Sequence, residues 1–250
     1  MPEIEPYFDP YIVRLQFGGN AFNFVIGDRT GKEWYDGPGR AQMTREDALA
    51  IPMTSSREGN LGWRELEILR DRLALPGSHI VECGTHHGLM TVMMAGWVGP
   101  TGFVSTFDAV HENITIVKNM LALNHVDNVA AYCAAIGGDF GIMQMRDTSN
   151  IVILGTANRS PHSALMVRVS SLLDGPPDAL KIDIEGAELG MIEAEKDFIA
   201  KVPRLAIEVH TDMLPEDGIE RLVTALGDRP IHVLWNDNRF TPYDGGPIRE

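Results

Sequence analysis

The central and C-terminal parts of the chain alternate between short apolar runs and longer amphipathic segments. The runs have the length of strands, and the segments repeat apolar residues every three or four positions, which is typical of helices packed on one side. The pattern predicts a helix over 63–75, strands over 79–83, 103–108, 129–133, 179–184 and 204–209, and helices over 88–97, 111–124, 187–199 and 215–226. This alternation predicts an α/β fold with a mostly parallel sheet and helices on both faces.

Residues 1–60 have a different pattern from the rest of the chain. Apolar and polar side chains alternate over 11–17 and 21–26, on either side of Gly18-Gly19-Asn20, which predicts a β-hairpin. We therefore expect two parts, an N-terminal hairpin extension over 1–60 and a main domain over 61–250. Two interpretations of the extension stay open: it packs on the core as a decoration, or it forms a lid over a binding site.

Two more regions interrupt the alternation. Between residues 137 and 177, the segments 150–154 and 164–169 resemble strands on either side of a polar loop, which indicates an inserted hairpin. Near the end of the chain, 231–235 and 239–243 predict a second strand pair around Asn236-Asp237-Asn238. Neither region is long enough to suggest a separate domain.

Composition and charge narrow the function classes. The 250 residues include 21 Lys and Arg against 35 Asp and Glu, a formal net charge of −14. This surplus of acid argues against a protein that binds a nucleic-acid backbone, and it repels anionic membranes. No apolar run approaches the roughly 18 residues of a bilayer-spanning helix. We expect neither a nucleic-acid nor a membrane partner.

The N-terminus and the cysteines suggest a compartment. Residues 1–6 are acidic and show no apolar core of a signal peptide. Cys83 and Cys133, both at the ends of predicted strands, are the two cysteines, and we interpret them as free thiols in a reducing environment. Both features predict a cytoplasmic protein.

Four acidic residues end predicted strands: Glu82, Asp108, Asp183 and Glu208. The carboxyl ends of parallel strands meet at one edge of the sheet, which is where α/β proteins bind ligands. Asp108, at the end of the second strand of the alternation, is placed to accept hydrogen bonds from both hydroxyls of a ribose. A crevice lined with carboxylates favours a ligand that offers hydroxyl groups and positive charge.

The turn after the first of these strands points the same way. A dinucleotide-binding turn has three glycines as G-x-G-x-x-G, whereas Gly84-Thr85-His86-His87-Gly88 has two, with imidazoles between them. This argues against an NAD-dependent oxidoreductase, which stays the alternative. A ribose, an amino-acid ammonium group and a sulfonium, the parts of S-adenosylmethionine, suit such a crevice.

The order of the motifs resembles that of FkbM-type S-adenosylmethionine-dependent methyltransferases. The most specific stretch is Lys181-Ile182-Asp183-Ile184-Glu185-Gly186-Ala187-Glu188, and the least specific is the glycine turn. The other matching stretches are 82–88, 107–109, 119–128, 134–137, 171–174 and 205–210. The chain departs from the family pattern at Glu82, where Asp is usual, at His86, where Asn is usual, and at Asp108-Ala109, where Glu-Pro is usual.

The resemblance implies a fold, a cofactor and a set of binding residues. The fold is a Rossmann-like, doubly wound, seven-stranded methyltransferase sheet with the N-terminal β-hairpin extension, and the cofactor is S-adenosylmethionine. Asp183 is implied to lie near the transferred methyl group. The residues implied to bind the cofactor are Glu82, Gly84, His86 and Gly88 at the methionine and ribose end, Asp108 at the ribose hydroxyls, and Ala135 and Ile136 at the adenine.

Methyl transfer to a hydroxyl requires a group that removes a proton. We prefer His210 as the base, because an ordinary imidazole titrates near neutrality; Asp183, Glu185 and Glu208 compete for the role. The same four side chains could ligate a divalent metal, but their spacing matches no specific metal motif, so we predict no metal site.

These observations predict an enzyme that methylates a hydroxyl of a small, sugar-bearing or natural-product-like acceptor. The acceptor class follows from the resemblance, and N-methylation stays open. A second alternative is a non-catalytic subunit that binds S-adenosylmethionine. Assembly as a homo-oligomer is also left open.

Overall fold

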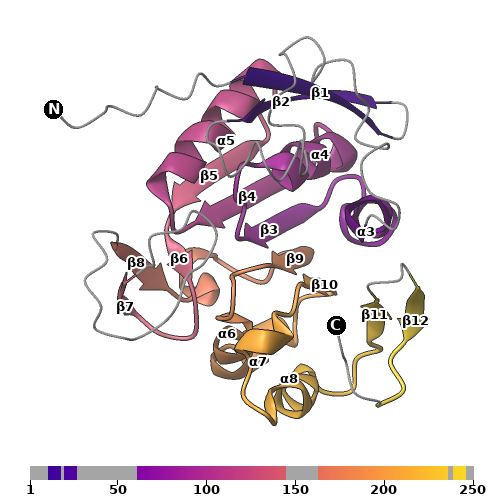
Figure 1. Ribbon diagram of the computed structural model, residues 1–250, viewed down its shortest axis with the longest axis vertical. Coiled ribbons are helices and arrows are strands. Elements are labelled where there is room, and N and C mark those ends of the chain that lie inside the picture. The colour runs from indigo at the N-terminus through magenta and orange to yellow at the C-terminus, as the bar shows by residue number, and fades with distance from the viewer. Residues whose placement is uncertain (1–10, 18–19, 27–60, 145–162, 236–238, 246–250) are drawn as a thin grey trace, which may run out of the picture.

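The computed structural model describes residues 11–17, 20–26, 61–144, 163–235 and 239–245. At its centre is a sheet of five parallel strands in the order β10-β9-β3-β4-β5 (Figure 1). Their bounds are β3 His79–Cys83, β4 Phe103–Asp108, β5 Val129–Cys133, β9 Ala179–Ile182 and β10 Arg204–Ile207. The expectation of seven strands is not met: in the described part of the chain, the main sheet has five strands.

The remaining described strands form small sheets of their own. β11 (His232–Leu234) and β12 (Phe240–Pro242) pair only with each other, so the predicted C-terminal strand pair does not extend the main sheet. β8 (Ser163–Val167) lies between β6 (Ala135–Ile136) and β7 (Gly141–Gln144). The segment 150–154, expected as the partner of this strand, lies outside the described residues.

Near the N-terminus, β1 (Tyr11–Phe17) and β2 (Asn20–Ile26) are antiparallel, with Tyr11 opposite Ile26 and Phe17 opposite Asn20. β2 lies against helix α5 of the main unit. Whether residues 1–60 act as a lid stays a prediction, because most of that segment lies outside the described residues.

Helices cover both faces of the main sheet. On one face lie α3 (Leu61–Ile68), which continues as a π-helical turn η3 (Leu69–Leu73), α4 (Leu89–Val98) and α5 (His111–Leu123). On the other lie α6 (Glu188–Ala194), α7 (Lys196–Ile199) and α8 (Gly218–Leu226). Two short 3₁₀ turns, η4 (Val169–Leu172) and η5 (Thr211–Met213), complete the described helical elements. None of the helices in the described ranges is both long and apolar enough to cross a bilayer.

The strands alternate between these two faces. In β3, Ile80 packs toward η3 and α4, whereas Val81 packs toward the side of α6 to α8. This period of two puts Glu82 on the same face as Ile80. Its register partners on the neighbouring strands are Thr106 and Lys181. That face of the sheet is therefore apolar at its start and polar at its carboxyl end.

The strand order reverses between β3 and β9. From β3 the chain moves through β4 to β5, and it then returns to the other side of β3 as β9 and β10. In an open α/β sheet, the connections on either side of such a point diverge and leave a ligand crevice. Here the loops that follow β3 and β9 border the reversal, so they carry the expected site.

These two loops touch through their backbones. Gly84, at the start of the β3 loop, has φ +87°, and a Cβ atom added there would lie 1.6 Å from the carbonyl oxygen of Asp183. The N–H of Asp183 in turn donates to the carbonyl of Cys83 at 2.9 Å. Only glycine combines that backbone conformation with so close an approach.

We expect Gly84→Ala to lower the free energy of unfolding by about 3 kcal/mol or more, because the methyl group must displace the Asp183 backbone as well as tolerate a positive φ. Gly227→Ala is the matched control. Gly227 also has a positive φ, +69°, but a Cβ there meets nothing within 4 Å, so Gly227→Ala should cost only the backbone strain, about 1–3 kcal/mol. Urea denaturation of both variants measures the difference, and equal losses would contradict the close-packing argument.

Candidate functional site

The loop between β3 and α4 is shaped by three residues with positive φ: Gly84 (+87°), His86 (+49°) and Gly88 (+82°). The N–H groups of Gly84 and Thr85 both donate to the carbonyl of Phe107 in β4, at 2.9 and 3.2 Å. The loop is thereby folded back over the end of β4. The rings of His86 and His87 stack at a centroid distance of 3.8 Å, with His87 fully buried.

Asp108 lies at the end of β4, beneath this loop. Its carboxylate accepts hydrogen bonds from the N–H groups of His86 and Val110, both at 2.8 Å, and from the Asn113 amide at 3.1 Å. Burial raises the pKa of Asp108 to about 6 in spite of these bonds. Each carboxylate oxygen has two lone pairs, so Oδ2, which accepts the His86 bond, can also accept from a ligand hydroxyl.

Ala135 and Ile136 form β6, which runs beside the end of β4. The N–H of Ala134 donates to the carbonyl of Asp108 at 2.9 Å, which fixes this strand next to the carboxylate. Ala135 packs with Ala109 and Val110, and both residues of β6 are buried. The residues expected at the adenine and at the ribose are therefore neighbours.

Glu82 is placed differently from the other acids. It is only 1% exposed, and its Oε2 accepts hydrogen bonds from Thr91 at 2.5 Å and Thr106 at 2.7 Å. Thr91 also bonds to Thr85 of the loop. Burial raises the pKa of Glu82, while the nearby ammonium of Lys181 opposes the rise. This position favours a supporting role beneath the loop over the direct cofactor contact expected from the sequence.

Lys181 is an ammonium group buried within the sheet, with 3% of its surface exposed. It donates to Asp183 at 3.2 Å. Burial by itself lowers the pKa of a lysine, but the carboxylates of Asp183, Glu65, Glu82 and Glu208 together raise the pKa of Lys181 above its usual value. For Glu65, burial outweighs the attraction of Lys181 and raises the pKa to about 7.

A second group of charges follows β9 and β10. His210 lies between two glutamates, with Nδ1 at 3.0 Å from Glu188 and Nε2 at 3.2 Å from Glu185. The hydrogen bond to Glu188 raises the pKa of His210 to about 9. Desolvation, only partly offset by His210, raises the pKa of Glu185 to about 7. At neutral pH the imidazole is therefore charged, and Glu185 is close to half ionised.

Glu208 belongs to the same crevice from the end of β10. Its N–H donates to the carbonyl of Ile182 at 2.9 Å, so the ends of β9 and β10 are level. Partial desolvation and the negative charge of Asp183 raise the pKa of Glu208. The crevice therefore carries more carboxylates than the cations Lys181 and His210 can neutralise.

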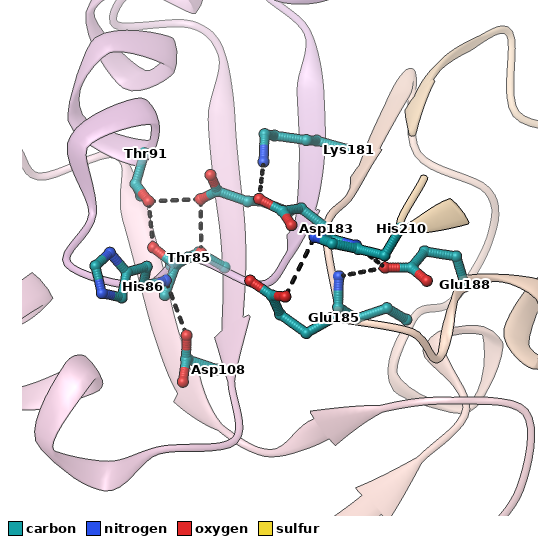
Figure 2. Close-up of polar contacts among 12 residues, drawn as sticks. Thr85, His86, Thr91, Asp108, Lys181, Asp183, Glu185, Glu188 and His210 are labelled. Atoms are coloured by element: carbon teal, nitrogen blue, oxygen red, sulfur yellow. Dashed lines mark hydrogen bonds and ion pairs between the residues drawn. The ribbon is translucent and has the colours of Figure 1, made fainter. Parts of the chain in front are cut away.

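Figure 2 shows two groups of labelled residues at the edge of the sheet: Thr85, His86 and Asp108 at the β3 loop, and Asp183, Glu185, Glu188 and His210 after β9 and β10. Glu208 interacts with Asp183 and His210. We define the carboxylate–histidine cluster as Asp183, Glu185, Glu188, Glu208 and His210. The sequence-predicted residues all fall in or beside these groups. The site residues that sequence reasoning did not single out are Glu65, Thr91, Thr106, Asn113, Lys181 and Glu188.

Some of these additional residues lie in a sequence motif, and others have no recognisable sequence pattern. Lys181 and Glu188 belong to the most specific motif of the chain, so the motif could have marked them. Thr106 lies next to Glu82 because the two are register partners on neighbouring strands. Glu65 and Thr91 come from helices that cover the same face of the sheet. Such contacts have no local pattern in the sequence.

Metal binding is geometrically feasible within this cluster. One ligand atom from each of Asp183, Glu185 and His210 lies within 4.8 Å of the others. In the structure, Nε2 of His210 is paired with Glu185. The prediction of no metal site stays a prediction.

Comparison with known proteins gave one family match. Residues 82–237 match the model of the Methyltransferase FkbM domain. No curated protein matches the chain. Among solved structures, the chain is similar to an rRNA methylase from Streptococcus thermophilus, with 15% identity, a TM-score of 0.46, and coverage of 75% of this chain and 95% of that one.

Two other solved structures are also similar. One is a SAM-dependent O-methyltransferase from Thermotoga maritima, with 13% identity, a TM-score of 0.44, and coverage of 96% of this chain and 74% of that one. The other is a SAM-dependent methyltransferase from Aquifex aeolicus, with 14% identity, a TM-score of 0.40, and coverage of 72% and 86%.

The raised pKa of Glu185 predicts a pH effect on stability. Folding raises this pKa from about 4.5 to about 7, so the contribution of Glu185 is complete below pH 4.5 and is lost as the pH rises through 7. Glu185→Gln cannot ionise. Its stability relative to the unmodified protein should therefore increase by about 1–3 kcal/mol between pH 5 and pH 8, after allowance for partial exposure.

Urea denaturation at several pH values measures this difference. Glu193→Gln serves as the control, because Glu193 is a surface glutamate paired with Arg221 at 2.7 Å, and that hydrogen bond lowers its pKa. Its stability difference should not increase over the same range. Parallel pH curves for Glu185→Gln and the unmodified protein would contradict the assignment.

Proposed function

The chain belongs to the FkbM methyltransferase domain family, and from this premise we propose that it methylates a hydroxyl group of a small acceptor. Family membership makes the protein a methyltransferase that uses S-adenosylmethionine. The proposal for the site itself is supported by one observation: Asp108 and the carboxylate–histidine cluster lie at the same edge of the sheet, on either side of the strand reversal. The nicotinamide-dependent alternative loses its support.

The residues around the β3 loop fit this cofactor. Asp108 would accept hydrogen bonds from ribose hydroxyls, and Ala135 with Ile136, which lie beside it, would line the adenine. The loop approaches closely because Gly84 and Gly88 adopt positive φ. Glu82 would act from below by holding Thr91 and the loop in place. When bound, the cofactor supplies a methyl group activated by a sulfonium.

The charge of the second group supports the same assignment. Asp183, Glu185 and Glu208 give the crevice a surplus of negative charge, which attracts a cationic sulfonium more strongly than the neutral thioether that remains after transfer. The cluster would therefore favour the substrate form of the cofactor over the product form.

Glu185 is our proposed base. A hydroxyl must lose its proton during transfer, and a group whose pKa lies near the working pH removes it most effectively. The pKa of Glu185 is about 7, and nearly a third of its side chain is exposed. His210, preferred from the sequence, has both ring nitrogens engaged and its pKa raised to about 9, so at neutral pH the charged ring holds no free lone pair.

The acceptor is proposed to be small and not a nucleic acid. A net charge of −14, with carboxylates concentrated in the crevice, repels a phosphate backbone. A sugar-bearing or natural-product-like compound offers hydroxyls without that repulsion. N-methylation stays the alternative, because a base that removes a proton from a hydroxyl also serves an ammonium.

Calorimetric titration with S-adenosylhomocysteine tests the cofactor site. We expect micromolar binding that Asp108→Ala weakens by at least tenfold, because the ribose hydroxyls lose their acceptor. Asp127→Ala, which changes an exposed aspartate outside the site, is the control and should bind normally. Tight NAD binding with no binding of the homocysteine compound would overturn the proposal.

A screen of hydroxylated acceptors with methyl-labelled cofactor tests the chemistry. Once an acceptor is found, Glu185→Gln should lower kcat by about 10²–10⁴ while leaving the dissociation constant of S-adenosylhomocysteine within about threefold, because only the base is lost. Glu208→Gln is the matched control from the same crevice and should lower kcat far less. The reverse order would move the role of base to Glu208, and binding without any transfer would favour the non-catalytic alternative.

A further inference from the structure

Glu188 is a fully buried glutamate at the first residue of α6, with no surface exposed. A charged side chain is rarely buried unless its hydrogen-bonding capacity is satisfied. Glu188 is satisfied by three separate groups of the site. Two are N–H groups of the loop after β9, and the third is the ring of His210.

The loop contacts fix the position of Glu185. The N–H of Ile184 donates to Oε1 of Glu188 at 3.2 Å, and the N–H of Gly186 reaches Oε1 and Oε2 at 3.1 and 3.0 Å. Glu185 lies between these two donors with φ +52°, a conformation that a glutamate rarely adopts without support. One carboxylate therefore holds both neighbours of the proposed base.

The third contact fixes the ring. Oε1 of Glu188 is 3.0 Å from Nδ1 of His210, which turns Nε2 toward Glu185 at 3.2 Å. A buried carboxylate beside an imidazole favours the protonated ring, as does Asp183. The imidazole of His210 therefore lies between two carboxylates, the buried one of Glu188 and the partly exposed one of Glu185.

We propose that Glu188 is a positioning residue for methyl transfer: it holds the ring of His210 and the backbone on both sides of Glu185 in place, so that His210 faces Glu185 and directs it into the site. This rests on the function proposed above. Glu185 is faced by His210 and Glu208 from the β10 side, and by Asp183 and Glu188 from the loop and α6. Burial is the largest cause of the raised pKa of Glu185, and among these neighbours His210 is the one that lowers it, so the position of His210 affects how readily Glu185 loses its proton.

A second buried glutamate provides the matched control. Glu195 is 3% exposed, and its carboxylate accepts hydrogen bonds from the N–H groups of Val169 and Ser170, both at 2.9 Å. Glu188→Gln and Glu195→Gln therefore make the same chemical change at equally buried sites that both hold backbone donors. Only the first change touches His210.

Nitrogen NMR of histidine-labelled protein tests the proposal without an acceptor. The chain has eight histidines, and His210→Gln identifies the His210 signal by its disappearance. In the unmodified protein, both ring nitrogens should carry protons at pH 7.5. In Glu188→Gln, the midpoint of the His210 titration should fall by at least one pH unit, whereas in Glu195→Gln it should stay within 0.3 unit.

The measurement on the unmodified protein decides the matter even if Glu188→Gln does not fold. A His210 that is neutral at pH 7.5 overturns the proposal, and so does a folded Glu188→Gln variant with an unchanged midpoint. Titration with S-adenosylhomocysteine, run on the same samples, distinguishes a failure of this proposal from a failure of the proposed function. Binding with no shift of the midpoint removes the role of Glu188 alone, whereas a shift without binding removes the methyltransferase assignment and leaves the link between Glu188 and His210 intact.

Discussion

The ammonium group of Lys181 is buried on the same face of the sheet as Glu82. A buried charge is tolerated only where opposite charges surround it. Asp183 contacts it directly, while Glu82 is its register partner on β3 and Glu65 reaches it from α3. The carboxylates on both sides of the strand reversal therefore interact with one cation, Lys181. The carboxyl end of the sheet is held together by charge where the rest of its core is held by apolar packing.

One cation does not neutralise this many acids, and the remainder defines the chemistry of the crevice. The raised pKa values of Glu65, Glu185 and Glu208 come first from burial, and repulsion between neighbouring carboxylates adds to it. His210 supplies a second positive charge, because its hydrogen bond with buried Glu188 raises its pKa. A ligand that brings positive charge relieves the same imbalance, which is why an acidic crevice and a sulfonium cofactor suit each other.

The two halves of the site meet because the chain reverses its strand order between β3 and β9. The backbone contact of Gly84 with Asp183 sets how closely their loops approach. On one side, the loop covers Asp108 with hydrogen-bond donors from His86 and Val110. On the other, the carboxylate–histidine cluster faces the same edge (Figure 2). The proposed binding of a ribose and the proposed removal of a proton therefore fall to separate loops of one sheet.

The sequence by itself determined the features that depend on neighbours along the chain. The predicted strands 79–83, 103–108 and 129–133 coincide with β3, β4 and β5, because the apolar runs and their turn residues are local signals. The motif around Asp183 indicated the family for the same reason. Tertiary structure alone decided that the main sheet of the described residues stops at five strands, since strand pairing joins segments distant in sequence. It also decided that Glu82 is buried beside Thr91 and that His210 lies against Glu188, because burial and the approach of Glu188 are set by packing between elements and leave no periodic pattern in the sequence.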